Sequence, residues 1–209
     1  MNFRLPKFTI KRKFGSDYFA IRLAKISDRE LVWEGYNNAP KCFFKHKTEI
    51  TLELINALYP VDGQINYEQA LPFNVMRLDE NGQEVEFAGN MTLNLAVSET
   101  GHVAEMKVGV LPKFQKRGIG TFLTKLSIKV AEAMPNIIQL RLKVTESNHR
   151  ARRIYNKCGF DEEIILEDRW VFPDGTTDNL IVMSVIFPEK EEQAKRINRA
   201  IPHLTHKNR

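Results

Sequence analysis

Two closely spaced glycines lie where a strand is expected to pass into a helix. Gly118 and Gly120 belong to the segment 115–120, which reads Q-K-R-G-I-G. Glycine has no Cβ atom, so the main chain there can approach a ligand closely and direct several N–H groups toward it. Because the N-terminus of a helix favours an anion, this spacing predicts a phosphate-binding turn. Taken alone, the segment is equally consistent with an ordinary helix that begins at a glycine turn.

The residues around the turn supply a helix and further positive charge. Apolar side chains recur at helical spacing after the glycines, and Pro135 ends the pattern. The apolar positions are Ile119, Phe122, Leu123, Leu126 and Val130. The basic side chains beside the turn are Lys113, Lys116 and Arg117. One face of the helix is therefore expected to pack, while its first turn stays available to a ligand.

Two other kinds of glycine-rich phosphate site do not agree with these residues. A dinucleotide fingerprint needs a third small residue where this chain has Leu123. It also needs an acidic residue about 20 positions further on, where Arg141 and Lys143 stand. A P-loop needs Lys and then Ser or Thr after its last glycine, and Gly120 is followed by Thr121 and a phenylalanine. Both kinds of site are excluded.

A second segment predicts a half-buried strand followed by a helix. Apolar and polar residues alternate over 138–144, as in a strand with one buried face. Asn148 is suited to the N-cap of the helix, and Gly159 to a left-handed residue at its end, before Phe160 begins the next strand. One face of this helix carries Ala151, Ile154, Tyr155 and Cys158.

The first half of the chain predicts further strands and helices. Tyr18 begins an alternating segment, and Ser27 and Thr48 are suited to cap helices that follow. Asn81 and Gly82 form a hairpin turn between two strands. The expected elements are a strand over 18–26, helices over 27–36 and 48–58, and strands over 74–78 and 84–97.

The order and spacing of the two motif segments match a known sequence pattern. The first motif is Q-x-x-G-x-G over 115–120, and the second is L-x-V-x-x-x-N-x-x-A-x-x-x-Y-x-x-x-G-F over 142–160. Together they resemble the GNAT family of acetyl-CoA-dependent N-acetyltransferases, with a likeness that extends over 103–187. The ending D-R-W-V-F-P-D-G-T-T-D-N-L-I-V-M over 168–183 is similar to the ribosomal-protein alanine acetyltransferase branch.

The resemblance implies a fold and an active-site position. The fold would be α/β of the mixed α+β kind: the GNAT acyl-CoA N-acyltransferase fold, with a central mixed, mostly antiparallel sheet flanked by helices. Two parallel strands would splay at the active site and admit acetyl-CoA between them. Gly109, in the strand expected over 102–110, is where a bulge could force these strands apart.

The resemblance also implies which residues bind acetyl-CoA. The backbones of Val108 and Val110 would contact the pantetheine arm, and the amide of Val110 would donate to the oxyanion. Asn148 would meet the pantetheine arm or the adenosine end. The pyrophosphate would lie against Gln115, Lys116, Arg117, Gly118, Ile119, Gly120 and Thr121.

Tyr155 is the predicted proton donor, and Glu105 and His102 are the candidate general bases. The family uses a tyrosine at this position to protonate the leaving thiolate, and a phenol with a pKa of about 10 can donate at hydrogen-bond distance. A base is needed because the attacking amine must lose a proton. The residues leave two plainer readings open: Tyr155 as a packing residue, and Glu105 with His102 as an exposed pair at a strand end.

The expected activity is direct transfer of an acetyl group from acetyl-CoA to a primary amine, without a metal. The acceptor expected first is a protein N-terminal or lysine amine. A small-molecule amine, such as an amino acid, a polyamine or an antibiotic, and aminoacyl-tRNA are the alternatives. The competing class is a non-catalytic CoA-binding module that engages RNA or a partner through its tails.

Composition predicts one enzyme domain over 17–187, between a basic N-terminal arm over 1–16 and a charged C-terminal tail over 188–209. A chain of 209 residues with 43% hydrophobic residues can bury a sizeable core. The formal net charge of +5 is concentrated at the ends, since the arm has five basic and no acidic side chains and the tail has six basic and three acidic. Such basic ends allow a weak contact with RNA or the ribosome.

Cysteine and hydrophobic patterns predict a cytoplasmic protein. Cys42 and Cys158 are far apart and lack metal-ligand spacing, so free thiols in a reducing compartment are expected. No apolar run approaches the roughly 20 residues needed to span a bilayer, so no membrane contact is expected. The oligomeric state stays open between a monomer and a homodimer.

Overall fold

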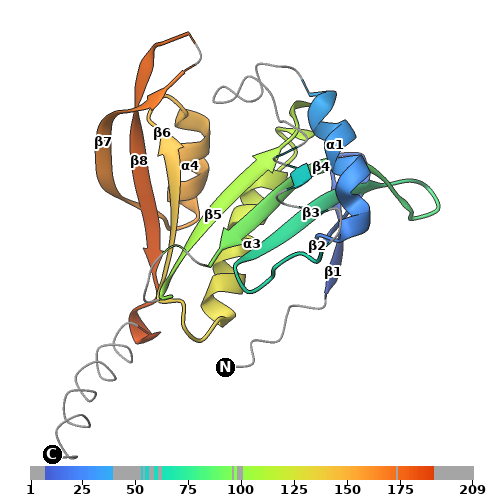
Figure 1. Ribbon diagram of the computed structural model, residues 1–209, viewed down its shortest axis with the longest axis horizontal. Helices are drawn as coiled ribbons and strands as arrows, with labels where there is room; N and C mark the ends of the chain where they lie inside the picture. The colour runs from blue at the N-terminus through green and yellow to red at the C-terminus, as the bar shows by residue number, and fades with distance from the viewer. Residues whose placement is uncertain are drawn as a thin grey trace, which may run out of the picture.

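In the described part of the chain, eight strands form a single sheet (Figure 1). The computed structural model describes residues 8–39, 53, 55–56, 59–60, 63–95, 97, 101–172 and 174–190. The strand order is β1-β2-β3-β4-β5-β6-β8-β7, with every neighbouring pair antiparallel except β5 and β6. The expected mixed, mostly antiparallel sheet is therefore confirmed. The strands are β1 (Thr9–Phe14), β2 (Asp17–Leu23), β3 (Ala70–Leu78), β4 (Glu84–Asn94), β5 (Val103–Val110), β6 (Gln139–Thr145), β7 (Asp161–Val171) and β8 (Thr177–Ile186).

Helices pack on both faces of this sheet. Their bounds are α1 (Arg29–Asn37), α3 (Ile119–Ala133) and α4 (His149–Lys157), with short 3-10 turns at η1 (Ile26–Asp28) and η3 (Pro112–Phe114). Within the described residues, none of the helices is both long enough and apolar enough to cross a membrane.

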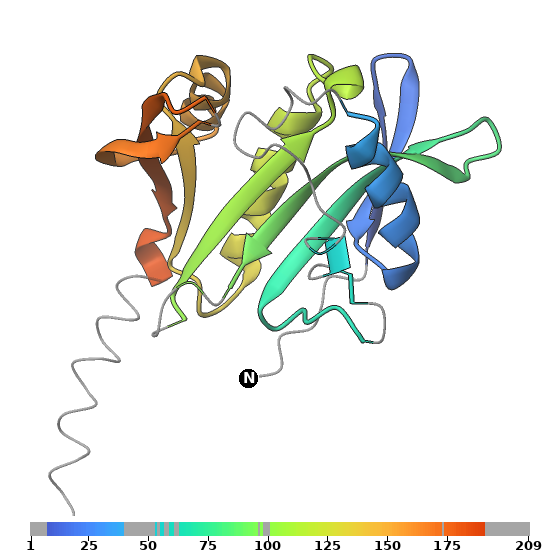
Figure 2. The same ribbon diagram turned by 45° about the horizontal axis from the view of Figure 1, so that its top comes forward.

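α1 and α3 lie on opposite faces of the sheet, on either side of β4 and β5 (Figure 2). On the α3 side, the Ser127 hydroxyl group lies 2.6 Å from the Met106 sulfur of β5. On the α1 side, the Tyr36 hydroxyl group donates a hydrogen bond of 3.1 Å to Asn90 Oδ1 of β4. Asn90 is paired with Gly109, three residues after Met106, so strand alternation directs Asn90 and Met106 to opposite faces.

The parallel strands β5 and β6 separate after a short paired stretch. Their register runs over three positions, from Val103 opposite Gln139 to Glu105 opposite Arg141. Beyond this point β5 continues beside β4, while β6 continues beside β8, so that the two strands diverge in Figure 1. The sheet therefore has the splayed parallel pair that the sequence led us to expect.

The bulge expected at Gly109 is not there. β5 pairs with β4 in unbroken register up to Val110. The irregularity lies one strand away, where Ala88 of β4 is an extra residue relative to β3. The glycine that serves a close approach is Gly89 of β4, because a Cβ atom there would lie only 2.3 Å from the Gly109 carbonyl oxygen.

The N-terminal segment contributes an edge strand that sequence patterns did not reveal. β1 pairs with β2 along its whole length. The ring of Phe14 lies 5.9 Å from that of Phe19 on β2 and 5.6 Å from that of Phe122 on α3. At the turn between β1 and β2, Asp17 accepts a hydrogen bond from Arg117 of the glycine turn. Part of the predicted basic arm is thus packed against the helix that follows the glycines.

A buried polar network fastens η1 and α1 to the sheet. Arg22 of β2 is 5% exposed and donates two hydrogen bonds of 2.8 Å to Asp28 and one of 2.8 Å to Glu84. Asn74 of β3 donates to Asp28 at 2.8 Å and accepts from the Tyr59 hydroxyl group at 2.9 Å. Asp28 ends η1 and is the N-cap residue of α1, so the network fixes where α1 begins.

Most of the other expected elements are present with shifted ends. The first expected strand corresponds to β2, the expected helix over 27–36 to η1 followed by α1, and the strand over 84–97 to the shorter β4. The expected helix over 48–58 lies largely outside the described residues.

Candidate active site

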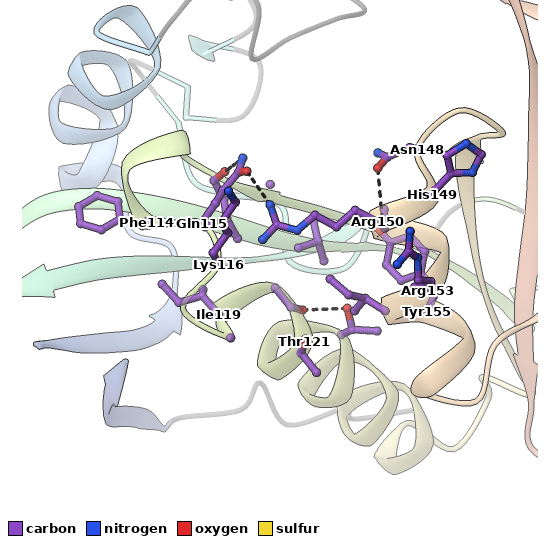
Figure 3. Close-up of a pocket in the computed structure, with 18 of the residues that line it drawn as sticks. Phe114, Gln115, Lys116, Ile119, Thr121, Asn148, His149, Arg150, Arg153 and Tyr155 are labelled. Atoms are coloured by element: carbon purple, nitrogen blue, oxygen red, sulfur yellow. Dashed lines mark hydrogen bonds between the residues drawn. The ribbon is translucent and has the colours of Figure 1, made fainter. Parts of the chain in front are cut away.

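A cavity opens where β5 and β6 separate (Figure 3). Its volume is about 870 Å³, and it is lined by the end of β5, the glycine turn, the N-terminal part of α3, the end of β6 with the loop after it, and α4. Arg117 is the one predicted cofactor-binding residue outside the lining. The lining includes Val108, Val110, Gln115, Lys116, Gly118, Ile119, Gly120, Thr121, Asn148 and Tyr155. Residues from separate parts of the sequence therefore share one cavity.

The glycine turn presents main-chain donors at the N-terminus of α3. Gly118 is the N-cap residue with a φ of +90°, and Lys116 has a φ of +61°. The amides from Ile119 to Thr121 have no acceptor within the helix, because the first helical hydrogen bond runs from Phe122 N to Gly118 O. Among the described residues, and apart from its two chain neighbours, nothing lies within 4 Å of the position that a Cβ atom would take at Gly118. The turn thus offers the donors and the open space that a pyrophosphate group requires.

The edge of β5 that faces the cavity carries main-chain groups that β4 does not use. Leu111 N donates to Ala88 O of β4 at 2.9 Å. Because successive residues of a strand direct their amides to opposite sides, the amides of Val110 and Val108 are directed away from β4 and toward the cavity. The Val110 carbonyl group, on the same side, accepts a 3.0 Å hydrogen bond from Gln115 Nε2. This edge can therefore pair with amide groups of an extended ligand.

Three basic side chains of α4 line the cavity and were missed by the sequence predictions. They are His149, Arg150 and Arg153, and Arg150 Nη1 donates to Gln115 Oε1 at 3.2 Å (Figure 3). The available signal was the run H-R-A-R-R directly after the predicted N-cap. Together with Lys116 of the glycine turn, these side chains give the cavity a positive lining suited to phosphate groups.

α4 begins and ends as predicted. The Asn148 side chain accepts a hydrogen bond of 3.2 Å from Ala151 N, as an N-cap residue does. Gly159 follows the helix with a φ of +94°. These two residues fix the length of α4 and so set where Tyr155 lies.

Tyr155 lines the cavity from the second half of α4 (Figure 3). Its ring lies 5.9 Å from that of Phe160, which packs it against the core. Burial raises the pKa of Tyr155 to about 12, with a further contribution from the neighbouring Cys158. The hydroxyl group therefore stays protonated at neutral pH and can act as a hydrogen-bond donor.

Of the three basic side chains predicted beside the turn, Lys116 alone lines the cavity. Lys113 forms a 2.7 Å ion pair with Glu86. Arg117 is engaged with Asp17 and donates to the Lys113 carbonyl group at 3.1 Å. Any contribution of Arg117 to a phosphate site would thus come from its backbone.

Glu105 lies at the last position where β5 is paired with β6, on the face opposite α3. It is 8% exposed, and its carboxylate is 3.0 Å from Lys143 Nζ and 3.4 Å from Arg141 Nε. Arg141 Nε is buried and has no hydrogen-bond partner, so its contact with Glu105 is a charge contact. The Glu105 carboxylate thus contacts two cations of β6.

His102 lies before the start of β5, at the closed end of the splayed pair. Its Nδ1 atom is 3.0 Å from the Asn136 carbonyl oxygen, and its own carbonyl group accepts from Ile138 N at 2.9 Å. Glu105 comes three positions later in the chain, which places His102 about 10 Å further from the cavity along the strand. Neither His102 nor Glu105 is among the described residues that line the cavity.

The cavity offers main-chain amides, one phenol and several basic side chains for chemistry. Among the described residues, no group of three or more His, Cys, Asp or Glu side chains is arranged to hold a metal ion. At one end of the cavity, main-chain donors can bind a pyrophosphate group, and along its wall a protonated phenol can donate a proton. A transferase that uses a nucleotide-bearing thioester needs both features.

The class that the fold and cavity define agrees with a direct family match. Residues 36–160 match the family described as "Acetyltransferase (GNAT) family". Because this match covers more than half of the chain, the chain belongs to the GNAT family of acetyltransferases. The family resemblance is thereby confirmed, and acetyl transfer is the class of reaction that membership defines.

Curated relatives differ in the acceptor for which they are named. The chain is 30% identical over 123 residues to a "[Ribosomal protein bS18]-alanine N-acetyltransferase" from Haemophilus influenzae, covering 58% of this chain and 78% of the relative. It is 36% identical over 75 residues to an "N-alpha-acetyltransferase" from Sulfurisphaera tokodaii, covering 36% of this chain and 42% of the relative. A "Spermidine N(1)-acetyltransferase" from Escherichia coli is 31% identical over 104 residues, covering 48% of this chain and 55% of the relative. The chain thus spans only about half the length of two of these three relatives.

Solved structures share the fold. A spermidine N-acetyltransferase from Vibrio cholerae in complex with CoA and spermine superimposes with a TM-score of 0.66 at 18% identity, covering 82% of this chain and 97% of that one. A microcin self-immunity acetyltransferase in complex with acetyl-CoA and AMP gives a TM-score of 0.63 at 15% identity, covering 80% and 92%. Both likenesses establish the fold of this chain.

Proposed function

We propose that this protein transfers an acetyl group from acetyl-CoA to the α-amine of a peptide or protein N-terminus. The observation that carries the proposal is the cavity between β5 and β6, which joins main-chain donors for a pyrophosphate to the hydroxyl group of Tyr155. Two of the curated relatives are named for an N-alpha or an alanine acceptor, which supports an N-terminal amine.

The residues that line the cavity suit acetyl-CoA. The glycine turn and the first-turn amides of α3 would hold the pyrophosphate, while the amides of Val108 and Val110 would pair with the pantetheine arm. Arg150 and Arg153 supply positive charge near the phosphates. When bound, acetyl-CoA supplies a thioester whose carbonyl carbon is open to attack by an amine.

Tyr155 is proposed as the donor to the departing thiolate. Its pKa of about 12 keeps the hydroxyl group protonated at every pH at which the amine can react, so a donor is always present. The packing of its ring against Phe160 restricts the direction in which the hydroxyl group points. The amide of Val110, directed toward the cavity, is proposed to donate to the thioester carbonyl oxygen as negative charge develops there.

The ease with which an amine loses its proton favours an α-amine over a lysine amine as the acceptor. Of the two predicted bases, Glu105 lies nearer the cavity, and its carboxylate is held by two cations. An α-amine has a pKa of about 8 and is partly neutral at neutral pH, whereas a lysine amine has a pKa of about 10.4 and is almost fully protonated. We therefore propose Glu105, directly or through water, as the acceptor of a proton that an α-amine gives up readily.

Replacement of the proposed donor tests this function. We expect Tyr155→Phe to lower kcat for acetylation of a peptide N-terminus by about 100-fold, because general acid catalysis typically contributes that much or more. The Kd for acetyl-CoA should stay within about twofold of wild type, since the ring and its packing are retained. Thiol release reports turnover, and calorimetric titration reports donor binding.

Tyr18→Phe is the matched control, because Tyr18 is 55% exposed on β2 and lies outside the cavity. Full activity of Tyr155→Phe would remove the phenol from the mechanism. A failure of the wild-type protein to release thiol with any amine, despite binding acetyl-CoA, would favour the non-catalytic binding module instead.

A further inference from the structure

Positive charge surrounds Glu105 on the face of the sheet opposite α3. Lys143 and Arg141 contact its carboxylate at 3.0 and 3.4 Å. Lys107, two residues further along β5, lies on the same face by strand alternation and is exposed. We call these four residues the acceptor-face cluster. Three cations around one carboxylate leave a surplus of two positive charges.

This face is the one from which an acceptor would reach the donor. The glycine turn holds the pyrophosphate at the N-terminus of α3, and α3 covers the other face of the sheet. A thioester that enters between β5 and β6 from the α3 side is therefore approached by an amine from the side of Glu105. This direction of approach rests on the proposed function.

The cations lie on both edges of the slot. Glu105 and Arg141 form the last paired position of β5 and β6, and the strands diverge beyond it. Lys107 on β5 and Lys143 on β6 come after this position, so one cation lies on each diverging strand. An acceptor amine that enters the slot from this face therefore approaches the two strands that carry them.

Among the strand neighbours of the cluster, β4 adds no charge to this face. β4 contributes Asn90, Thr92 and Asn94, which are neutral and share the face through their register with β5. Glu163 of β7 is held by hydrogen bonds from Gln139 and Ser184, beside the closed end of the splayed pair. The surplus of positive charge therefore faces the slot.

The cluster also has free capacity to bind a carboxylate. The Arg141 side chain is 32% exposed, so its guanidinium group can contact a ligand as well as Glu105. The Lys143 side chain is 44% exposed, so its ammonium group can contact a ligand as well as Glu105.

We infer that the acceptor carries a carboxylate close to its reactive amine, and that Lys107, Arg141 and Lys143 bind this carboxylate. A peptide with an acidic first residue has this chemistry, and so does a free amino acid. A polyamine has the opposite charge and is repelled by the same side chains.

A panel of matched acceptors tests the inference. The panel contains a pentapeptide amide that begins with Asp, the same peptide with Asn in its place, free aspartate, alaninamide and spermidine. We expect kcat/KM for the Asp peptide to exceed that for the Asn peptide by about tenfold, as a single favourable charge contact near a protein surface allows. Spermidine should be the poorest substrate. The ratio of kcat/KM for the Asp peptide to kcat/KM for free aspartate tells whether the carboxylate belongs to a peptide or to an amino acid.

In the double variant Lys107→Gln/Lys143→Gln, the ratio of kcat/KM for the Asp peptide to that for the Asn peptide should fall close to one. Lys129→Gln is the matched control, because Lys129 is exposed on α3 at the opposite face, and it should leave the ratio unchanged. Raising the ionic strength should lower the ratio in wild type and leave it unchanged in the double variant. A wild-type ratio at or below one, or a high ratio that survives in the double variant, would overturn the inference.

Binding of the peptides is measured alongside turnover, by fluorescence anisotropy with a label at the peptide C-terminus. Tighter binding of the Asp peptide without any thiol release would support the acceptor-face cluster and contradict the proposed function. If the thiol of CoA is released at equal rates with all acceptors, the result would support acetyl transfer and contradict the role of the cluster.

Discussion

Tyr155 shows how burial suits one side chain to its proposed task. The phenol is packed against Phe160, and burial raises its pKa to about 12. A group with this pKa stays a donor throughout the pH range of an assay. The acceptor amine, by contrast, must be neutral before it attacks, so the pH dependence of the reaction should follow the amine alone.

This difference gives a testable pH profile. For a peptide α-amine, we expect kcat/KM to rise with pH, to bend near the amine pKa of about 8, and to stay level up to about pH 10. For a lysine side-chain amine, the bend should move to about pH 10.4. Thiol release measured over this range checks both curves. A falling limb between pH 8 and 10 would mean that a group other than Tyr155 donates the proton.

At the scale of the elements, the sequence predicted the parts of the site that depend on local chemistry. Gly118 has the left-handed backbone that glycine favours, and Asn148 caps α4 through its own side chain, so both follow from neighbouring residues alone. The splay of β5 and β6 came from the family resemblance. The ion pairs of Glu105 depend on the register between two strands far apart in the sequence, and no local pattern records that register.

Other features were missed for similar reasons. β1 has mostly exposed side chains and many cations, so it lacks the alternation of a half-buried strand; its position depends on pairing with β2 and on the burial of Phe14. A bulge was expected in β5, but the register is irregular in β4, where it pairs with β3. Pairing between strands, which no local sequence pattern records, sets this position.

The network around Arg22 predicts a large loss of stability when one member is removed. Arg22→Ala should lower the free energy of unfolding by about 3–5 kcal/mol, because it leaves Asp28 buried without its charged partner. Arg77→Ala is the matched control. Arg77 forms a partly exposed pair with Glu86, and its loss should cost at most about 1 kcal/mol. Urea unfolding of both variants measures the difference, and equal losses would contradict the assigned role of Arg22.

At the scale of the whole molecule, the sheet is held together at its centre by the short paired stretch of β5 and β6. Strands β1 to β5, together with α1 and α3, form one side of the slot (Figure 1). The other side is formed by β6, β8, β7 and α4. The N-terminal hairpin of β1 and β2 is linked to the first side through Phe14 and Asp17, which reach α3 and the glycine turn.

Removal of β1 should therefore affect the donor site as well as stability. A chain that begins at residue 17 loses Phe14, and we expect it to unfold with about 3–5 kcal/mol less free energy, as for deletion of a buried aromatic side chain. Acetyl-CoA should also bind it more weakly, since the packing beside the glycine turn is lost. Thermal unfolding with and without acetyl-CoA measures both effects. A chain that begins at residue 8 retains β1 and is the comparison; identical behaviour of the two chains would contradict the role of the hairpin.

The close approach of Gly89 and Gly109 restricts how this sequence can diverge while it keeps its slot. Any residue other than glycine at position 89 would bring a Cβ atom to 2.3 Å from the Gly109 carbonyl oxygen and to 2.9 Å from Val110 Cα. Relief of that overlap would move β5, whose far edge is the wall of the cavity. Gly89 is not among the residues that line the cavity, yet a substitution there would reach the cavity wall through the backbone.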